Sequence, residues 1–186
     1  MSHHIYHTEG LVLSGYNTGE ANKYVAVFTR ELGLVRATVQ SIRKSTSKLR
    51  YSLQNYSFAK VDFVRGRDVW RITSAMPLSL FDTALKDPEK ARIVARVAML
   101  LERLCHGEEE NEQFFRDVLA GFKELETTPV DTEALLNFET IFVAKILYHL
   151  GYWKDQNGMA SIESDVLADR RQVIHRINES LKESHL

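Results

Sequence analysis

The sequence has little cysteine and no long apolar run, and each shortage excludes a class of protein. Only one of its 186 residues, Cys105, is a cysteine. An intrachain disulfide framework and a multi-cysteine zinc site are therefore excluded. No uninterrupted apolar stretch of about 18 residues occurs, and the first residues, MSHHIYH, contain no apolar signal region. We expect a soluble, cytoplasmic protein that is not inserted in a membrane.

A net charge of either sign is also lacking, because 24 Lys and Arg face 25 Asp and Glu. The balance conceals a division along the chain. Residues 1–80 hold 11 Lys and Arg against 5 Asp and Glu, whereas residues 81–186 hold 13 against 20. Such an asymmetry is typical of a nucleic-acid-binding segment joined to a segment with another role.

Sequence patterns of catalysis are missing too. There is no glycine-rich phosphate loop, nucleophile elbow or zinc-protease helix. Cys105 falls late in an apolar helical pattern, which predicts a buried, unreactive thiol; a small hydrolase centred on Cys105 is the weaker alternative. His3, His4 and His7 have no acidic or thiolate neighbour in the sequence, so a metal site there is disfavoured. We expect a protein that is not an enzyme and needs no cofactor.

Short runs rich in Val, Thr, Tyr and Phe, separated by turn residues, fill the first 79 residues and predict β-structure. Five strands are expected, at Tyr6–Tyr16, Lys23–Arg30, Leu34–Ile42, Ser57–Val64 and Val69–Ser74. Between the last two, Gly66 is expected to adopt a positive φ in a hairpin loop. Five short strands in so short a segment favour a small closed barrel of the OB type, and an SH3-like barrel remains an alternative.

After Met76-Pro77 the apolar period becomes that of helices, and we predict a domain boundary near residue 79. Four helices are expected, starting at Asp87-Pro88, after Glu108-Glu109-Glu110, near a capping-box-like Thr128-Pro129-Val130-Asp131, and after the looser stretch Trp153–Ser161. The predicted class is α+β, with a five-stranded OB-fold barrel in residues 1–79 and an all-α helical domain in residues 80–186.

The segment between the third and fourth strands is polar and basic, with no period that would bury it, so it is expected to be a surface loop or a short helix. Single-stranded nucleic acid is held by positive grooves and by aromatic faces on which bases stack. The candidate binding residues are those of this loop, the following hairpin and the last strand: Arg43, Lys44, Lys48, Arg50, Tyr51, Arg65, Arg67 and Arg71. Tyr56 and Trp70 are further nearby aromatics. Ordinary surface charge and ordinary barrel core are the alternative interpretation of the same residues.

The order of several motifs resembles the RecO family. They are Thr8-Glu9-Gly10-Leu11-Val12-Leu13, Gly19-Glu20-Ala21, Phe28-Thr29-Arg30-Glu31-Leu32-Gly33, Lys48-Leu49-Arg50, Leu53-Gln54, Phe63-Val64-Arg65-Gly66-Arg67 and Arg71-Ile72-Thr73, and in the helical part Leu150-Gly151-Tyr152. The similarity is nearly continuous over residues 5–75 and sparse afterwards.

The resemblance implies a mediator of DNA repair and homologous recombination in the RecF pathway. Such a protein binds and anneals single-stranded DNA, works with RecR and the single-strand-binding protein, and helps to load RecA; binding of duplex DNA remains open. Many relatives carry a cysteine-rich zinc module after the Leu-Gly-Tyr segment, whereas Trp153–Ile162 contains no cysteine here. We therefore expect no zinc. A second hypothesis is an adaptor whose helical domain holds the acidic tail of single-strand-binding protein, with incidental DNA contact.

Overall fold

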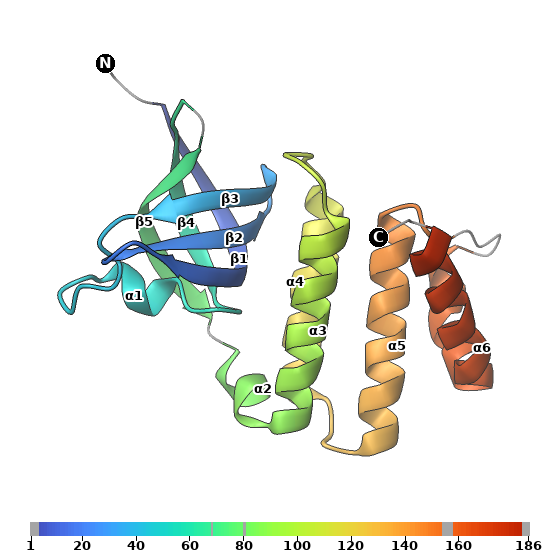
Figure 1. Cartoon of the computed structure of the whole chain (residues 1–186). Coiled ribbons are helices and arrows are strands. Elements are labelled where there is room, and N and C mark those ends of the chain that lie inside the picture. The colour runs from blue at the N-terminus through green and yellow to red at the C-terminus, as the bar shows by residue number, and fades with distance from the viewer. Residues whose placement is uncertain (1–3, 68, 80, 154–157, 184–186) are drawn as a thin grey trace. The chain divides into compact units, whose positions relative to one another are not determined.

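The structure is a computed structural model that describes residues 4–67, 69–79, 81–153 and 158–183. Its N-terminal part is a barrel of five strands: β1 (Ile5–Thr18), β2 (Asn22–Thr29), β3 (Gly33–Val39), β4 (Phe58–Arg65) and β5 (Trp70–Ser79). The barrel closes in the order β1-β2-β3-β5-β4 (Figure 1). Its interior is filled by alternating strand residues such as Val25, Val27 and Val35, as expected where every second side chain points inward.

Helices follow the barrel, and together the two parts confirm the predicted α+β class with an N-terminal OB-type barrel. Strand β3 pairs with β5 in parallel, and the other neighbouring strands are antiparallel. Strand β5 continues beyond its expected end at Ser74, through Pro77 to Ser79. Pro77 is tolerated because the pairing with β4 is irregular beside it, between Phe58 and Ala59.

The prediction that Gly66 has a positive φ is wrong, since Gly66 is absent from the residues with that conformation. Its amide donates a hydrogen bond to the Val69 carbonyl oxygen at 3.0 Å. A Cβ atom on Gly66 would lie 2.7 Å from the same oxygen. Glycine is required here because two backbone segments approach closely, which the sequence pattern of a hairpin does not distinguish from a left-handed turn.

The basic segment after β3 contains a short helix, α1 (Leu49–Ser52), one of the two forms expected for it. Strand β3 ends at Val39, earlier than the expected Ile42, and Ser41 then has a φ of 56°. The amide of Ser41 donates to Asn22 Oδ1 at 3.0 Å, which fixes the chain beside the start of β2. The loop and α1 are thus held at the end of the barrel where β1 turns into β2 (Figure 1).

The helices are α2 (Asp82–Lys86), α3 (Pro88–Leu104), α4 (Glu112–Thr127), α5 (Thr132–His149) and α6 (Ile162–Glu183), with a 3-10 turn at Met159–Ser161. Asp87 caps α3, as predicted, by accepting from the amides of Glu89 and Lys90 at 3.0 Å. Asp131 rather than Thr128 caps α5, accepting from the amide of Ala134 at 2.9 Å. Short α2 was not predicted, because five residues carry too little periodicity to stand out.

Contacts divide the chain into two compact units. The first comprises residues 1–82 with 98–116, and the second comprises residues 83–97 with 117–186. In the first unit the Phe28 ring lies 5.2 Å from that of Phe114. In the second, α5 packs on α6 and the rings of Phe122 and Phe142 lie 5.7 Å apart. A domain boundary near residue 79 stays a prediction.

Within the described parts of the chain, no helix is both long and apolar enough to cross a membrane.

Candidate nucleic-acid interface

A groove of about 590 Å³ lies at the end of the barrel that carries α1. Its lining comes from β1, β2, the loop after β3, and α1 with its C-terminal continuation: Asn17, Lys23, Ile42, Arg43, Arg50, Leu53 and Gln54. Arg43 is held there at both ends, since its amide donates to the Ala21 carbonyl at 3.1 Å and its guanidinium to the Gly19 carbonyl at 3.2 Å. We call this hollow, with its three cations Lys23, Arg43 and Arg50, the cationic groove.

Lys23 belongs to the cationic groove but is not among the predicted site residues. Its ammonium donates to the Leu53 carbonyl oxygen and to Asn55 Oδ1, each at 3.2 Å. Burial lowers its pKa below the ordinary lysine value. The sequence did contain a signal, because Lys23 shares the strand phase of Val25 and Val27, both fully buried in the barrel. A lysine that faces the barrel interior, like the core valines, extends its ammonium group toward solvent at the open end of the barrel.

The predicted basic loop provides charge that no carboxylate neutralises. Arg43, Lys44, Lys48 and Arg50 are exposed, and none forms an ion pair with any residue that the structure describes. Four cations of the helices do have carboxylate partners: Arg92 pairs with Glu89, Arg96 with Glu139, Arg116 with Glu112, and Lys145 with Glu163. Four exposed cations without carboxylate partners thus lie close together in the sequence around α1, where a polyanion can displace counterions.

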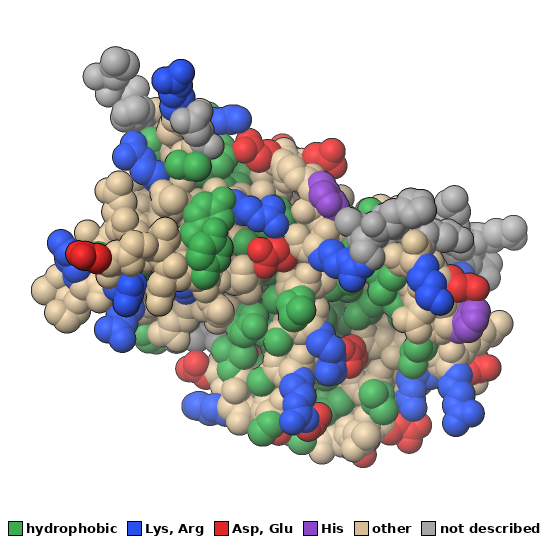
Figure 2. All heavy atoms as spheres, in the orientation of Figure 1, with side chains coloured by type: hydrophobic (Ala, Val, Ile, Leu, Met, Phe, Trp, Pro, Cys, Tyr) green, Lys and Arg blue, Asp and Glu red, His purple; other side chains and the backbone are tan. Residues whose placement is uncertain are grey.

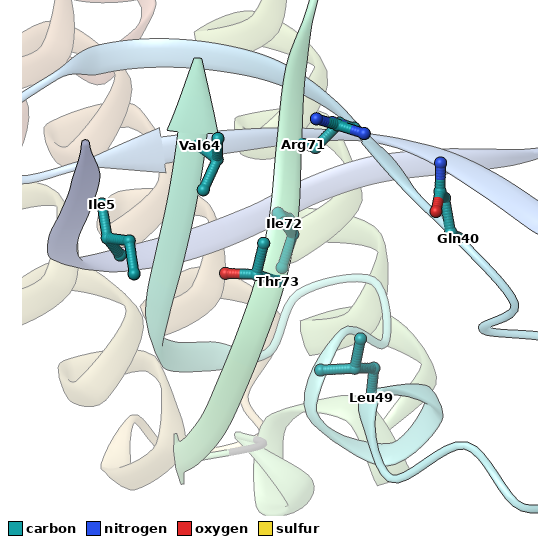
Figure 3. A pocket seen from close by; sticks show the side chains of 7 residues that line it. All are labelled: Ile5, Gln40, Leu49, Val64, Arg71, Ile72 and Thr73. Carbon is teal, nitrogen blue, oxygen red and sulfur yellow. The ribbon is translucent and has the colours of Figure 1, made fainter. Parts of the chain in front are cut away.

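Arg71 lies in a second groove, of about 440 Å³, whose lining is mainly apolar. Ile5 and Val64 lie on one side of β5 and Gln40 and Leu49 on the other, with Ile72 and Thr73 on β5 itself (Figure 3). The two grooves meet at α1, because Leu49 lines the second groove and the next residue, Arg50, lines the cationic groove. We call the second hollow the Arg71 groove.

Arg65 and Arg67 are not brought together with the basic loop. They lie on the β4–β5 hairpin, whose tip projects away from α1 (Figure 1), and Figure 2 shows Lys and Arg side chains over the barrel and over the helices alike. Arg65 Nη1 lies 3.4 Å from Glu108 Oε2, and the guanidinium lies 5.3 Å from the centre of the Trp70 ring. Glu108 therefore neutralises part of the predicted charge on the hairpin.

The aromatic candidates differ in access. Tyr51 is 55% exposed on α1, so its ring is available to a base. Trp70 is 7% exposed, and its indole N–H donates to Glu108 Oε1 at 2.7 Å, which makes it part of the core. Tyr56 is half-buried, with a φ of 70° and its amide donating to the Val12 carbonyl. Tyr16, 63% exposed and adjacent to groove residue Asn17, was missed because strand alternation alone does not say which face is wet.

The residues considered for catalysis or metal binding lie elsewhere. Cys105 is buried, and burial raises the pKa of its thiol to about 12, so the nucleophilic thiolate is suppressed. His7 Nδ1 lies 2.6 Å from Asp62 Oδ1, and His3 falls outside the described residues. Among the residues that the structure places, no three His, Cys, Asp or Glu side chains are grouped so that they could hold a metal ion.

The fold and its surface define an OB-barrel protein with an uncompensated basic groove and a helical C-terminal part. Residues 1–81 match the family described as Recombination protein O N terminal. The match covers less than half of the chain, so it shows that the N-terminal part resembles the RecO family.

Several proteins named DNA repair protein RecO are similar to a longer part of the chain. The chain is 28% identical over 148 residues to the DNA repair protein RecO of Heliobacterium modesticaldum, covering 80% of this chain and 52% of that protein. It is 26% identical over 151 residues to DNA repair protein RecO of Clostridium novyi, covering 81% and 58%. With the protein of the same name from Rubrobacter xylanophilus it shares 26% over 162 residues, covering 87% and 64%. The chain thus spans a little over half the length of these relatives.

Proposed function

We propose that this protein binds single-stranded DNA without sequence specificity through the cationic groove and the adjoining basic loop, and that it acts in DNA repair and homologous recombination. In this role it is not an enzyme. It promotes annealing of complementary strands and, with RecR, helps to load RecA in the RecF pathway, receiving its substrate from single-strand-binding protein. The names of the relatives, which are DNA repair proteins, support the role.

The observation that carries the proposal is the cluster of free cations at one end of the barrel. A carboxylate beside each of these cations would have weakened the attraction for phosphate, as Glu89 does for Arg92 and Glu112 does for Arg116. Instead Lys23 and Arg43 are oriented by carbonyl and amide oxygens, which hold the side chains without neutralising them. Cations positioned in this way bind a phosphate backbone of any sequence.

The preference for single strands depends on exposed aromatic faces. Duplex DNA presents the same phosphates to Lys48 and Arg50, but its bases are stacked on each other and give nothing to Tyr51. An unpaired base can lie on the Tyr51 ring, a contact of about 1–3 kcal/mol in single-strand-binding proteins. The proposal therefore includes a weaker, purely electrostatic affinity for duplexes.

The test is a salt titration of a fluorescein-labelled oligonucleotide by anisotropy, with the parent protein and the double variant Lys48→Ala/Arg50→Ala. Each phosphate contact contributes about 0.7 to the slope of log affinity against log salt for single strands. Losing two contacts should lower the slope by about 1.4. The control is Arg92→Ala/Arg116→Ala, which removes the same charge from two exposed helical arginines that already have partners. Equal slopes and affinities for the parent and the Lys48/Arg50 variant would remove the assigned site.

A second function, an adaptor that holds the acidic tail of single-strand-binding protein, is supported by apolar side chains left exposed on the helices. Leu167 is 73% exposed on α6, and Leu136 is 42% exposed on α5. A hydrophobic-ended peptide could bury such residues. Calorimetric titration of the tail peptide into the DNA-free protein tests this role, which requires heat of binding that is lost in Leu167→Ser but kept in Lys48→Ala/Arg50→Ala.

A further inference from the structure

The Arg71 groove forms where the wall of the barrel opens between two strands. Strands β3 and β5 pair only at Ala37 with Trp70 and at Thr38 with Arg71. Beyond Arg71, β5 continues its pairing with β4, and α1 also contacts β5. The chain leaves β3 at Val39, so Gln40 and Leu49 form a wall that stands apart from β5. A hollow follows from this separation of backbone elements rather than from a missing side chain.

The surface of this hollow suits a flat ligand with apolar faces. Four aliphatic side chains line it, Ile5, Leu49, Val64 and Ile72; Ile5 is 46% exposed, whereas Val64 and Ile72 are buried and form the floor of the hollow. The polar groups are the Gln40 amide, the Thr73 hydroxyl and the Arg71 guanidinium (Figure 3). Apolar walls with a few polar groups and a volume of about 440 Å³ are typical of small-ligand sites.

The position of the hollow indicates which ligand arrives there. Leu49 and Arg50 are consecutive residues of α1, so the Arg71 groove and the cationic groove lie on either side of one helical turn. Arg71 itself forms no ion pair with the residues that the structure describes, so its guanidinium can meet a phosphate. A polyanion held by Arg43 and Arg50 would thus pass directly over α1 toward the apolar hollow.

We infer that the Arg71 groove takes up one unstacked nucleobase of a DNA single strand whose phosphates lie in the cationic groove, with Arg71 contacting the phosphate of the inserted nucleotide. This inference rests on the proposed function. The faces of the base pack against the Ile5 and Leu49 side chains, and these aliphatic contacts do not distinguish one base from another. The Gln40 amide can turn to donate or to accept, so it satisfies either kind of base edge.

In this arrangement a single nucleotide of the bound DNA has its base inserted in the Arg71 groove, and the other nucleotides are held through their phosphates. Removing its aliphatic contacts costs part of the transfer free energy of a buried apolar surface, so a strand of abasic sugar-phosphate units should bind about fivefold to tenfold more weakly than oligo(dA) of equal length. The salt slope of the two strands should be the same, because both present the same phosphates.

Methyl NMR of the full chain, labelled at isoleucine δ1 methyl groups, tests the inference directly. Ile5 and Ile72 line the Arg71 groove, whereas Ile42 lines the cationic groove. Oligo(dA) should shift all three methyl signals, with the larger ring-current shifts at Ile5 and Ile72. The abasic strand should shift Ile42 alone. Single Ile→Val variants assign the signals without altering the fold.

The remaining outcomes separate two failures. If both strands shift Ile42 and neither shifts Ile5 or Ile72, the nucleobase site is overturned while DNA binding at the cationic groove stands. If both strands shift Ile5 equally, the hollow contacts sugar and phosphate, and the base site is again overturned. If no strand shifts any of the three signals, DNA binding at the barrel fails together with the inference.

An affinity measurement provides an independent check. Ile5→Ala removes one wall of the hollow, and we expect the preference for oligo(dA) over the abasic strand to fall by about threefold. The matched control is Leu78→Ala on β5, a residue 40% exposed that does not line either groove. An equal loss of preference in both variants, or no loss in Ile5→Ala, would contradict the assigned position of the base.

Discussion

Glu108 forms an ion pair with Arg65 on the β4–β5 hairpin, and this pair competes with any contact between Arg65 and DNA. Substituting Glu108 therefore tests whether the hairpin belongs to the DNA interface. Its carboxylate accepts from the Trp70 indole at 2.7 Å and pairs with Arg65 at 3.4 Å. The side chains of the pair are 63% and 39% exposed, so the attraction is screened and amounts to at most about 1 kcal/mol. DNA has to overcome that attraction before Arg65 can contact a phosphate.

Glu108→Gln keeps an oxygen for the Trp70 N–H but removes the charge that holds Arg65. If the hairpin contacts the bound DNA, affinity for a single-stranded oligonucleotide should rise by about fivefold or less. That ratio corresponds to the free energy of the Arg65–Glu108 ion pair. The salt slope should steepen by about 0.7, the value of one added phosphate contact. Anisotropy titrations at several salt concentrations measure both quantities.

The control for net charge is Glu109→Gln, because Glu109 is an exposed neighbour and forms no ion pair with Arg65. Long-range repulsion alone would give the two variants the same small gain and an unchanged slope. That result would refute the assignment of Arg65 to the interface. In Glu108→Gln the Trp70 N–H donates to a neutral amide oxygen, which is a weaker acceptor than a carboxylate. The variant should therefore lose about 1 kcal/mol of unfolding free energy, which urea denaturation measures.

Three further predictions concern stability. Gly33→Ala should lower the free energy of unfolding by about 2 kcal/mol or more, because φ is +61° and the new Cβ would lie 2.7 Å from the Glu109 backbone. Gly19→Ala, with a φ of +58° and open space around it, should cost only about 1 kcal/mol in the same urea unfolding assay. Similar losses in the two variants would exclude the close approach to Glu109 as a cause. Asp131→Ala should cost about 1 kcal/mol in the same assay, and an unchanged midpoint would argue against its capping role. The thiol pKa of Cys105 is raised from 9.0 to about 12, so the stabilisation by the buried neutral thiol is complete below pH 9 and is lost as the pH rises toward 12. The stability of the parent relative to Cys105→Ala should therefore decline over that range, and a constant difference would contradict the burial of the thiol.

Local features of the fold could be predicted because their causes lie within a few residues of each other. The strands of the barrel follow from alternating side chains, and the start of α3 follows from Asp87 and Pro88, which supply a capping oxygen and a fixed φ. The capping segment from Thr128 to Asp131 was also recognised, but only the backbone conformation selects Asp131 as the residue that caps α5. Gly66 failed for a related reason, because the approach of Val69 is a feature of three-dimensional structure.

The sequence by itself determined that the N-terminal strands form a small barrel and that a basic segment without apolar period, Arg43–Arg50, stays on its surface. Only the tertiary structure decided which cations remain free. Arg65 meets Glu108 from a distant part of the chain, whereas Lys23 enters the groove through the phase of its strand. Electrostatic compensation depends on distances between side chains that are remote in sequence, and a linear pattern of charges does not contain those distances.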